Sequence, residues 1–261
     1  MTVQVLQASF DEDVMSEFRL LIDNKFVKYV TIDPGIFERD DLCFAPSLIS
    51  LMPALPSGDW NTAHIARDTV SGDPAFTAIS NRRLRGITKI WHATQIDHLD
   101  FHLVHKLRTN VYKATCAHFD TPVIVKLARF EWEIARLEAE TIAYEWINGQ
   151  QIGPEFLRHL IEEGRVIGFI LSNISECRHA TIEDYALCYE ALSKLHRLGI
   201  KHGDINKHNF LVHDGKAALI DFDTSSREAQ ADELEGELRE LGDQLRDTSG
   251  RGGRVVVTSP S

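Results

Sequence analysis

His202-Gly203-Asp204-Ile205-Asn206-Lys207-His208-Asn209 is followed, twelve residues after its last member, by Asp221-Phe222-Asp223. Transfer of a phosphoryl group requires a carboxylate that receives or orients the proton of the attacking hydroxyl, and oxygen ligands that hold magnesium against the phosphates. Asp204, Asn209 and Asp221 carry side chains of these kinds. The two motifs therefore predict a phosphoryl-transfer site with these three residues as its candidate groups.

A β-hairpin is predicted between the two motifs. Residues 210–213 and 216–220 are strand-like, and Asp214-Gly215 between them is typical of a tight hairpin turn. Because the turn is centred between these two residues, position 209 lies opposite position 220. Asn209 is thus expected to begin one strand where Asp221 ends its partner, which brings two oxygen ligands to one end of the hairpin.

A strand that ends in a lysine, Val123-Ile124-Val125-Lys126, is predicted further upstream, with a helix over residues 131–147 after it. In that helix Leu137, Tyr144 and Ile147 form an apolar stripe, and Glu140 falls inside the stripe at i+3 from Leu137. A carboxylate among apolar residues needs a cationic partner, and Lys126 is the candidate. Glu138, on the polar face, remains the alternative.

The remaining elements predict a mixed α+β chain. Further strands are expected from Leu99 to Leu103, at 110–116, at 122–127 and at 165–172, and further helices at 181–198, with Thr181 as N-cap, and at 226–246. One short helix is expected from Phe10 to Phe26, and residues 31–80 look loop-like because prolines interrupt any helical pattern there.

H-G-D-x4-N, D-F-D, V-x-V-K and the helix glutamate occur in the order found in protein kinases. The chain therefore resembles an atypical protein-kinase-like family over residues 98–225. The stretches KLRTNVYKA, VIVKLARFEWEI, GRVIGFIL and LHRLGIKHGDINKHNFLV resemble kinase-like proteins of fungal genomes. H-G-D and D-F-D are also similar to motifs of aminoglycoside phosphotransferases and lipopolysaccharide kinases.

This resemblance implies an α+β, protein-kinase-like two-lobed fold with a small C-terminal lobe, an N-terminal extension, and ATP and Mg²⁺ as cofactors. It implies that Asp204 is the catalytic base and that Lys126 and Glu140 form the catalytic ion pair that anchors the phosphates. The implied metal ligands are Asn209, Asp221 and Asp223. The implied nucleotide-binding residues are Lys126, Val111, Ile124, Ser172 and Ile174.

The implied domains are a loop-rich N-terminal extension at 1–95, a kinase-like N-lobe at 96–173, a reduced C-lobe at 174–247 and a mobile tail at 248–261. The chain departs from the kinase pattern at residues 106–111, which contain no glycine where kinases have a glycine-rich phosphate loop. Ile124 also replaces a small residue beside the adenine. The leading hypothesis is a phosphotransferase that acts on a protein or small-molecule hydroxyl, and the alternative is a pseudokinase that serves as a nucleotide-binding or scaffold module.

The composition of the chain limits the classes of partner that it is expected to bind. The net charge of −11 predicts no nucleic-acid partner and no anionic membrane partner, because no broad basic surface is available. The four cysteines are scattered, and no apolar run approaches the ~18 residues that would span a membrane. We therefore expect a reduced, intracellular protein, cytoplasmic or nuclear, whose partners are a nucleotide and an unknown acceptor.

Overall fold

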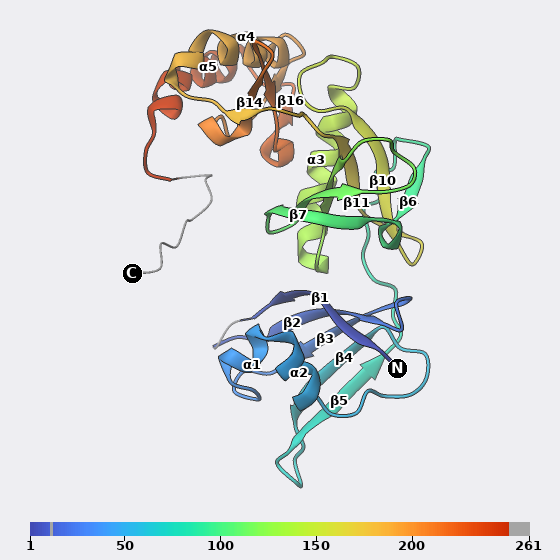
Figure 1. The fold of residues 1–261 in the computed structure, drawn as a ribbon. Helices are drawn as coiled ribbons and strands as arrows, with labels where there is room; N and C mark the ends of the chain where they lie inside the picture. Colours follow the sequence, from blue (N-terminus) through green and yellow to red (C-terminus); the bar gives the residue numbers. More distant parts are fainter. Residues whose placement is uncertain (11–12, 251–261) are drawn as a thin grey trace. The chain divides into compact units, whose positions relative to one another are not determined.

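The computed structural model describes residues 1–10 and 13–250, which divide into two compact units (Figure 1). The first unit comprises Met1–Arg85 with Arg129–Glu131, and the second comprises Gly86–Ala128 with the residues from Trp132 onward. Each unit contains helices and β-sheets, so the predicted α+β class is confirmed. The main segment of the first unit ends at Arg85, whereas the expected extension covers residues 1–95.

The first unit is built on a five-stranded sheet in the order β1-β2-β3-β4-β5. All neighbours pair antiparallel except β3 and β4, which are parallel and are joined through two short helices. The elements are β1 (Val3–Ser9), β2 (Ser16–Ile22), β3 (Phe26–Ile32), α1 (Arg39–Cys43), α2 (Ala45–Leu51), β4 (Thr62–Arg67) and β5 (Pro74–Ser80).

The helix expected from Phe10 to Phe26 is wrong for the part of that range that is described. Residues 16–22 and 26–32 form the antiparallel strands β2 and β3, joined at Asp23 and Asn24, which have φ angles of 52° and 54°. Both positions are left-handed, a conformation that Asp and Asn tolerate in hairpin turns. Phe18, Leu20 and Ile22 are buried in the core beneath this sheet, so tertiary pairing overrides the predicted helix.

The loop-like reading of residues 31–80 is also wrong. Two of the prolines there lie at positions compatible with regular structure, since Pro46 occupies the first turn of α2 and Pro74 begins β5, whereas Pro34, Pro53 and Pro56 lie between elements. Leu42 of α1 and Leu48 of α2 pack with Trp60 into the core of this unit. The loop-rich extension is therefore a folded unit with its own hydrophobic core.

The second unit contains a six-stranded sheet in the order β6-β10-β11-β9-β8-β7. All pairs are antiparallel except β6 and β10. The strands are β6 (Gln95–Asp97), β7 (His102–Arg108), β8 (Val111–Thr115), β9 (Val123–Leu127), β10 (Phe156–Glu162) and β11 (Arg165–Ser172). A Cβ at Gly168 of β11 would lie 2.1 Å from the Lys126 carbonyl oxygen, so only glycine allows this approach to the lysine strand.

The helix α3 (Ile134–Trp146) follows β9 and packs against β11 and the 3-10 turn Phe222–Thr224 (Figure 1). It corresponds to the helix expected at 131–147. Leu137, Tyr144 and Ile147 are buried, as the apolar stripe predicts.

The C-terminal half of this unit holds two helices and short strands. The helix α4 (Tyr185–His196) is preceded by a capping box between Thr181 and Asp184. The predicted hairpin is confirmed as β14 (Phe210–His213) and β15 (Lys216–Leu219), which join β12 (Arg178–His179) in a three-stranded sheet.

The last helix is α5 (Ala231–Arg246). It begins later than the expected residue 226, because Ser226 and Arg227 form the strand β16 against β13 (Ile200–Lys201). No helix in residues 1–10 and 13–250 is long and apolar enough to cross a membrane. From residue 251 on, the expected mobile tail lies outside the described residues.

Candidate functional site

The loop between α4 and β14 holds Asp204 in a network of amide hydrogen bonds. Its Oδ2 atom accepts from the side-chain amides of Asn206 (3.0 Å) and Asn209 (3.2 Å). The Asn209 amide also donates to the Asp204 carbonyl oxygen at 2.9 Å. Asn209 thereby fixes both the backbone and the carboxylate of Asp204. Asn209 and Asp204 are two of the site residues that the sequence predicts.

The hairpin brings the second motif beside this loop. Phe210 pairs with Leu219, and the Ile220 N–H donates to the Asn209 carbonyl oxygen at 3.0 Å, so Asp221 follows directly after the residue opposite Asn209. The turn residues Asp214 and Gly215 have φ angles of 46° and 68°. The hairpin therefore places Asp221 next to the residue that pairs with Asn209, as the spacing predicts.

Asp221 itself has φ 68° and ψ 60°, a left-handed conformation that costs a non-glycine residue about 1–2 kcal/mol. Such strain is maintained only where the surrounding structure fixes it, and it is concentrated at functional sites. Here the preceding strand and the buried Phe222 ring fix the backbone on both sides.

Lys126, in β9, links the six-stranded sheet to Asp221 at the end of the hairpin. Its Nζ atom lies 2.5 Å from Glu140 Oε2 on α3 and 2.6 Å from Asp221 Oδ1. The alternative residue Glu138 lies elsewhere, where its Oε1 accepts hydrogen bonds from the backbone N–H groups of Thr88 (2.7 Å) and Lys89 (3.1 Å). The structure therefore brings Lys126 together with Glu140 rather than with Glu138.

Lys126 and Asp221 hold each other ionised, whereas burial raises the pKa of Glu140 despite its pairing with Lys126. Burial opposes the charge on Lys126, but Glu140 and Asp221 outweigh it and hold the pKa of Lys126 above its ordinary value. Burial likewise opposes the charge on Asp221, yet Lys126 and Arg108 lower the pKa of that carboxyl. Arg108, from the end of β7, lies 3.0 Å from Asp221 Oδ2, so two cations flank one carboxylate.

A cavity of about 640 Å³ opens beside this cluster. Its walls include Lys126, Glu140 and Asp221, and also the predicted nucleotide-binding residues Val111, Ile124, Ser172 and Ile174. Arg108 lines the cavity at the turn that replaces a glycine-rich loop. Asp204, Asn209 and Asp223 are not among the lining residues.

Asp223, the third predicted metal ligand, forms an ion pair with Arg136 of α3. The Asp223 side chain is 5% exposed, whereas that of Arg136 is 71% exposed. The pair ties the second motif to the helix that carries Glu140. In this arrangement Asp223 is placed to position α3, and its carboxylate already has a cationic partner.

The residues present fit a magnesium ion at one point in particular. The Oδ1 atom of Asn209 is buried and has no hydrogen-bond partner, which leaves an oxygen free to act as a ligand. No group of three or more His, Cys, Asp or Glu side chains suitable for a metal occurs in the described part of the chain. Asn209 with Asp221 would be a sparse set, of the kind that magnesium completes with phosphate oxygens and water.

Glu237 of α5 is a site residue that sequence reasoning missed. Its carboxylate accepts hydrogen bonds from the backbone N–H groups of His202 (3.0 Å) and Gly203 (2.7 Å), and lies 2.7 Å from His196 Nε2. A signal existed in the sequence, because Glu237 falls at i+3 from Leu234 and i−4 from Leu241, inside the apolar stripe of its helix.

Aromatic rings connect the loop to the helix α3. The buried His202 ring lies 5.1 Å from the Phe222 ring, and its Nε2 atom lies 3.1 Å from the Ile220 carbonyl oxygen. Phe222 in turn meets Tyr144 of α3 edge-on, with ring centroids 5.2 Å apart. The positions of His202 and Asp221 are thus packed against the helix that holds Glu140.

Residues 175–248 match the lipopolysaccharide kinase (Kdo/WaaP) family. The matched segment covers less than a third of the 261 residues and contains both sequence motifs. This match supports a kinase-type phosphotransferase, a class that uses ATP as phosphate donor and typically a divalent metal. No curated protein matches the chain. The finer resemblance to fungal kinase-like proteins stays a prediction.

Proposed function

We propose that the second unit is a protein-kinase-like, two-lobed phosphotransferase that transfers the γ-phosphoryl group of ATP to a hydroxyl of a protein or small molecule. In this proposal residues 96–173 form the N-lobe and residues 174–247 a reduced C-lobe. The observation that carries the proposal is the convergence of Lys126, Glu140 and Asp221 on the wall of a nucleotide-sized cavity.

The nucleotide is assigned to this cavity. The base would be enclosed by Val111 and Ile124 of the six-stranded sheet and by Ser172 and Ile174 at the end of β11 and just after it. Lys126 would contact the phosphates, held in place by Glu140. Arg108 offers a second cation at the turn where backbone amides would otherwise cradle the phosphates.

The metal is assigned to Asn209 and Asp221. A bound magnesium ion would neutralise charge on the phosphate oxygens during transfer. Asn209 contributes its unpartnered Oδ1 atom, while Asp221 is kept ionised by Lys126 and Arg108. Asp223, paired with Arg136, is left as a residue that positions α3 rather than as a third ligand.

Asp204 is assigned the role of base. Its Oδ2 atom is oriented by the amides of Asn206 and Asn209, so the carboxylate is held in one direction before the acceptor arrives. It would accept the hydroxyl proton of the acceptor as the new P–O bond forms and the bond to the leaving ADP oxygen breaks.

Release of ADP and transfer of labelled phosphate, measured with Mg²⁺ over a panel of acceptors, test this function. Asp204→Asn and Asp221→Asn should each lower the rate by at least a hundredfold. Asp214→Asn is the matched control, since it makes the same change at the exposed hairpin turn, where asparagine tolerates the left-handed backbone. Equal inactivity of wild type and all three variants would exclude catalysis.

A nucleotide-binding module without transfer activity is the second candidate. The contact between Arg108 and Asp221, 3.0 Å long, favours it, because a guanidinium on this carboxylate competes with a metal. Thermal denaturation with Mg-ATP and with ATP plus a chelator separates the candidates. Stabilisation that requires Mg²⁺ and Asp221 favours the transferase, whereas stabilisation by ATP alone favours the binding module.

A further inference from the structure

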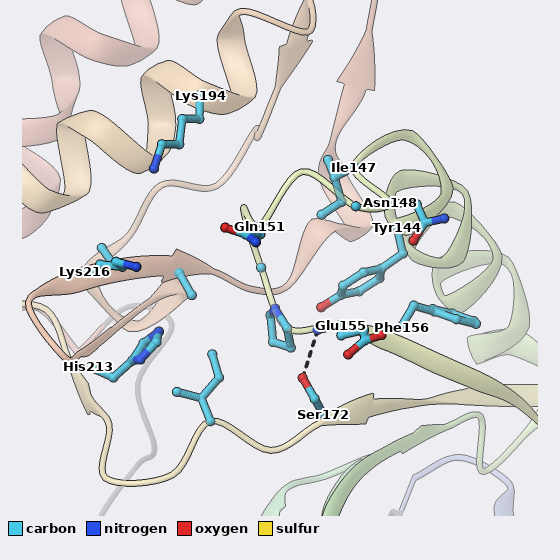
Figure 2. Close-up of a pocket in the computed structure, with 16 residues that line it drawn as sticks. Tyr144, Ile147, Asn148, Gln151, Glu155, Phe156, Ser172, Lys194, His213 and Lys216 are labelled. Atoms are coloured by element: carbon cyan, nitrogen blue, oxygen red, sulfur yellow. Dashed lines mark hydrogen bonds between the residues drawn. The ribbon is translucent and has the colours of Figure 1, made fainter.

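A second cavity, of about 580 Å³, lies in the same unit beside the proposed nucleotide cavity. Its walls come from residues 147–156, from the segment that follows β11, from α4 and from the β14–β15 hairpin (Figure 2). Lys126, Asp204 and Asp221 do not line it. Tyr144, Pro154, Ser172 and Ile174 line both cavities, so they form the wall between them.

Tyr144 supplies an unsatisfied donor to this wall. The residue is 2% exposed, and its hydroxyl oxygen has no hydrogen-bond partner in the described chain. Burial and the charges of Glu140 and Asp221 raise the pKa of Tyr144 well above its ordinary value, so the hydroxyl keeps its proton. Figure 2 shows the hydroxyl end of the ring directed away from α3, toward the loop that leads to Glu155.

The unpaired hydroxyl is energetically significant. A buried polar group without a partner costs about 1–3 kcal/mol, and buried tyrosine hydroxyls usually find one. A ligand atom that accepts this hydrogen bond would remove the cost. The hydroxyl is therefore a specific feature of the cavity wall that points to a ligand, rather than one more surface polar group.

Basic side chains stand opposite Tyr144. Lys194 of α4, Lys216 of β15 and His213 of β14 lie on one side of the cavity, and Tyr144 and Phe156 on the other (Figure 2).

The acidic groups nearby only partly offset these cations. Glu155 is the acidic lining residue, and Lys194 also pairs with the exposed Glu190 at 3.1 Å. Exposed pairs of this kind contribute about 0–1 kcal/mol, so Lys194 can exchange Glu190 for a ligand at little cost. His213 likewise has the exposed Asp214 at 3.8 Å, so the two lysines are the groups that make this side of the cavity basic.

Apolar side chains form much of the rest of the lining. Ile147 and Pro154 contribute to it beside Phe156, and Ala217 and Ala218 of β15 add small side chains that leave room. The arrangement is typical of small-molecule sites, where an apolar surface holds the body of the ligand and a few polar groups fix its orientation.

We propose that this cavity binds a small organic anion, with its apolar body against Phe156 and Pro154 and its acidic group at Lys194 and Lys216. The acidic group is a carboxylate, a sulfonate or a phosphate, and an acceptor atom on the body takes the Tyr144 hydroxyl hydrogen bond. The proposal does not rest on phosphoryl transfer at the neighbouring cavity, with which this one shares a wall.

Fluorescence titration of the full chain with 8-anilinonaphthalene-1-sulfonate, an aromatic body with one sulfonate, tests the proposal. The double variant Lys194→Ala/Lys216→Ala should weaken binding at least tenfold, while Lys89→Ala, which removes one positive charge from an exposed position outside the cavity, should not. Tyr144→Phe, which deletes only the hydroxyl, should weaken binding severalfold.

Two filling variants separate the cavities. Ala217→Trp should abolish the saturable signal, and Val111→Trp, which fills only the nucleotide cavity, should retain it. Circular dichroism and melting temperature show whether each variant folds, and if Ala217→Trp does not fold, the exposed lysine variants decide. Unchanged affinity in the double lysine variant, loss of signal only in Val111→Trp, or no saturable binding by wild type would each overturn the proposal.

Discussion

Glu237, on the last helix, accepts a hydrogen bond of 2.7 Å from the backbone N–H of Gly203 in the His-Gly-Asp motif. Its second oxygen accepts from the His202 N–H at 3.0 Å. Burial opposes the charge on Glu237, but these bonds and the one from His196 hold the pKa of the carboxyl below its ordinary value. An ionised carboxylate thus fixes the backbone directly before Asp204.

Replacement of Glu237 by alanine should destabilise the protein by about 2–5 kcal/mol, since two buried N–H groups lose their acceptor. Transfer activity should fall as well, because the loop before Asp204 is no longer held. Urea denaturation and initial rates measure the two effects. Glu240→Ala, on the exposed face of the same helix, is the control and should change neither. A fully active Glu237→Ala protein would contradict the anchoring role.

Gly203→Ala should be more damaging than an ordinary change at a left-handed glycine. Gly203 has φ +86°, and a Cβ there would lie 2.6 Å from the Thr224 carbonyl oxygen. The substitution should therefore cost more than the ~1–2 kcal/mol of backbone strain alone and should lower activity. Gly215→Ala is the matched control, since its φ is +68° with no atom within 4 Å, and melting temperatures of both variants give the comparison.

Lys126→Met should abolish detectable transfer and destabilise the fold by about 3–5 kcal/mol, because the buried carboxyl groups of Glu140 and Asp221 would lose the cation that they share. Glu140→Gln should be milder, since Asp221 still pairs with Lys126. The double variant should cost less than the sum of the two, which a double-mutant cycle on unfolding free energy measures. Full additivity would argue against a working ion pair.

Glu138→Gln tests the choice between the two helix glutamates. Glu138 binds the backbone at Thr88 and Lys89, so its substitution should lower stability slightly and leave the rate constant of transfer unchanged at temperatures where the protein is folded. A rate loss equal to that of Glu140→Gln would show that the neighbouring contacts, and not the pair with Lys126, matter for activity.

The buried imidazole of His159 should make stability depend on pH. Burial and the neighbouring His92 lower the pKa of His159 from 6.5 to about 4. Between these values the unfolded chain binds the proton and the folded chain does not, so stability is present above pH 6.5 and is lost as pH falls toward 4, by up to about 3 kcal/mol.

His159→Leu should remove this part of the pH dependence, as measured by urea denaturation at intervals from pH 7.5 to 4.5. The exposed His105→Leu is the matched control and should retain the wild-type slope. If both variants lose stability with acid as steeply as wild type does, His159 is not the group that titrates.

Local spacing was sufficient to predict much of the second unit. The hairpin at 210–220 follows from its turn dipeptide, and the register then places Asn209 beside Asp221 with no information from the rest of the chain. The apolar stripe of α3 likewise selects Glu140, because the helical period alone decides which glutamate faces the core.

The first unit could not be predicted in the same way. Residues 16–32 contain apolar residues that fit either a helix or two strands, and only pairing with β1 and β4 decides for strands. The prolines of residues 31–80 interrupt helical patterns, but Pro46 is compatible with the start of a helix and Pro74 with the start of a strand. Burial in a shared core, which no local window contains, resolves both cases.

The sequence by itself determined which chemical groups the site contains and their order along the chain, because turn and helix periods act over a few residues. Only the tertiary structure decided their partners: Arg108 on Asp221, Arg136 on Asp223 and Glu237 under Gly203. These contacts join residues that are 34 to 113 positions apart. Their pairing depends on how sheets and helices pack together, so it cannot be predicted from the charges of these residues or from their spacing along the chain.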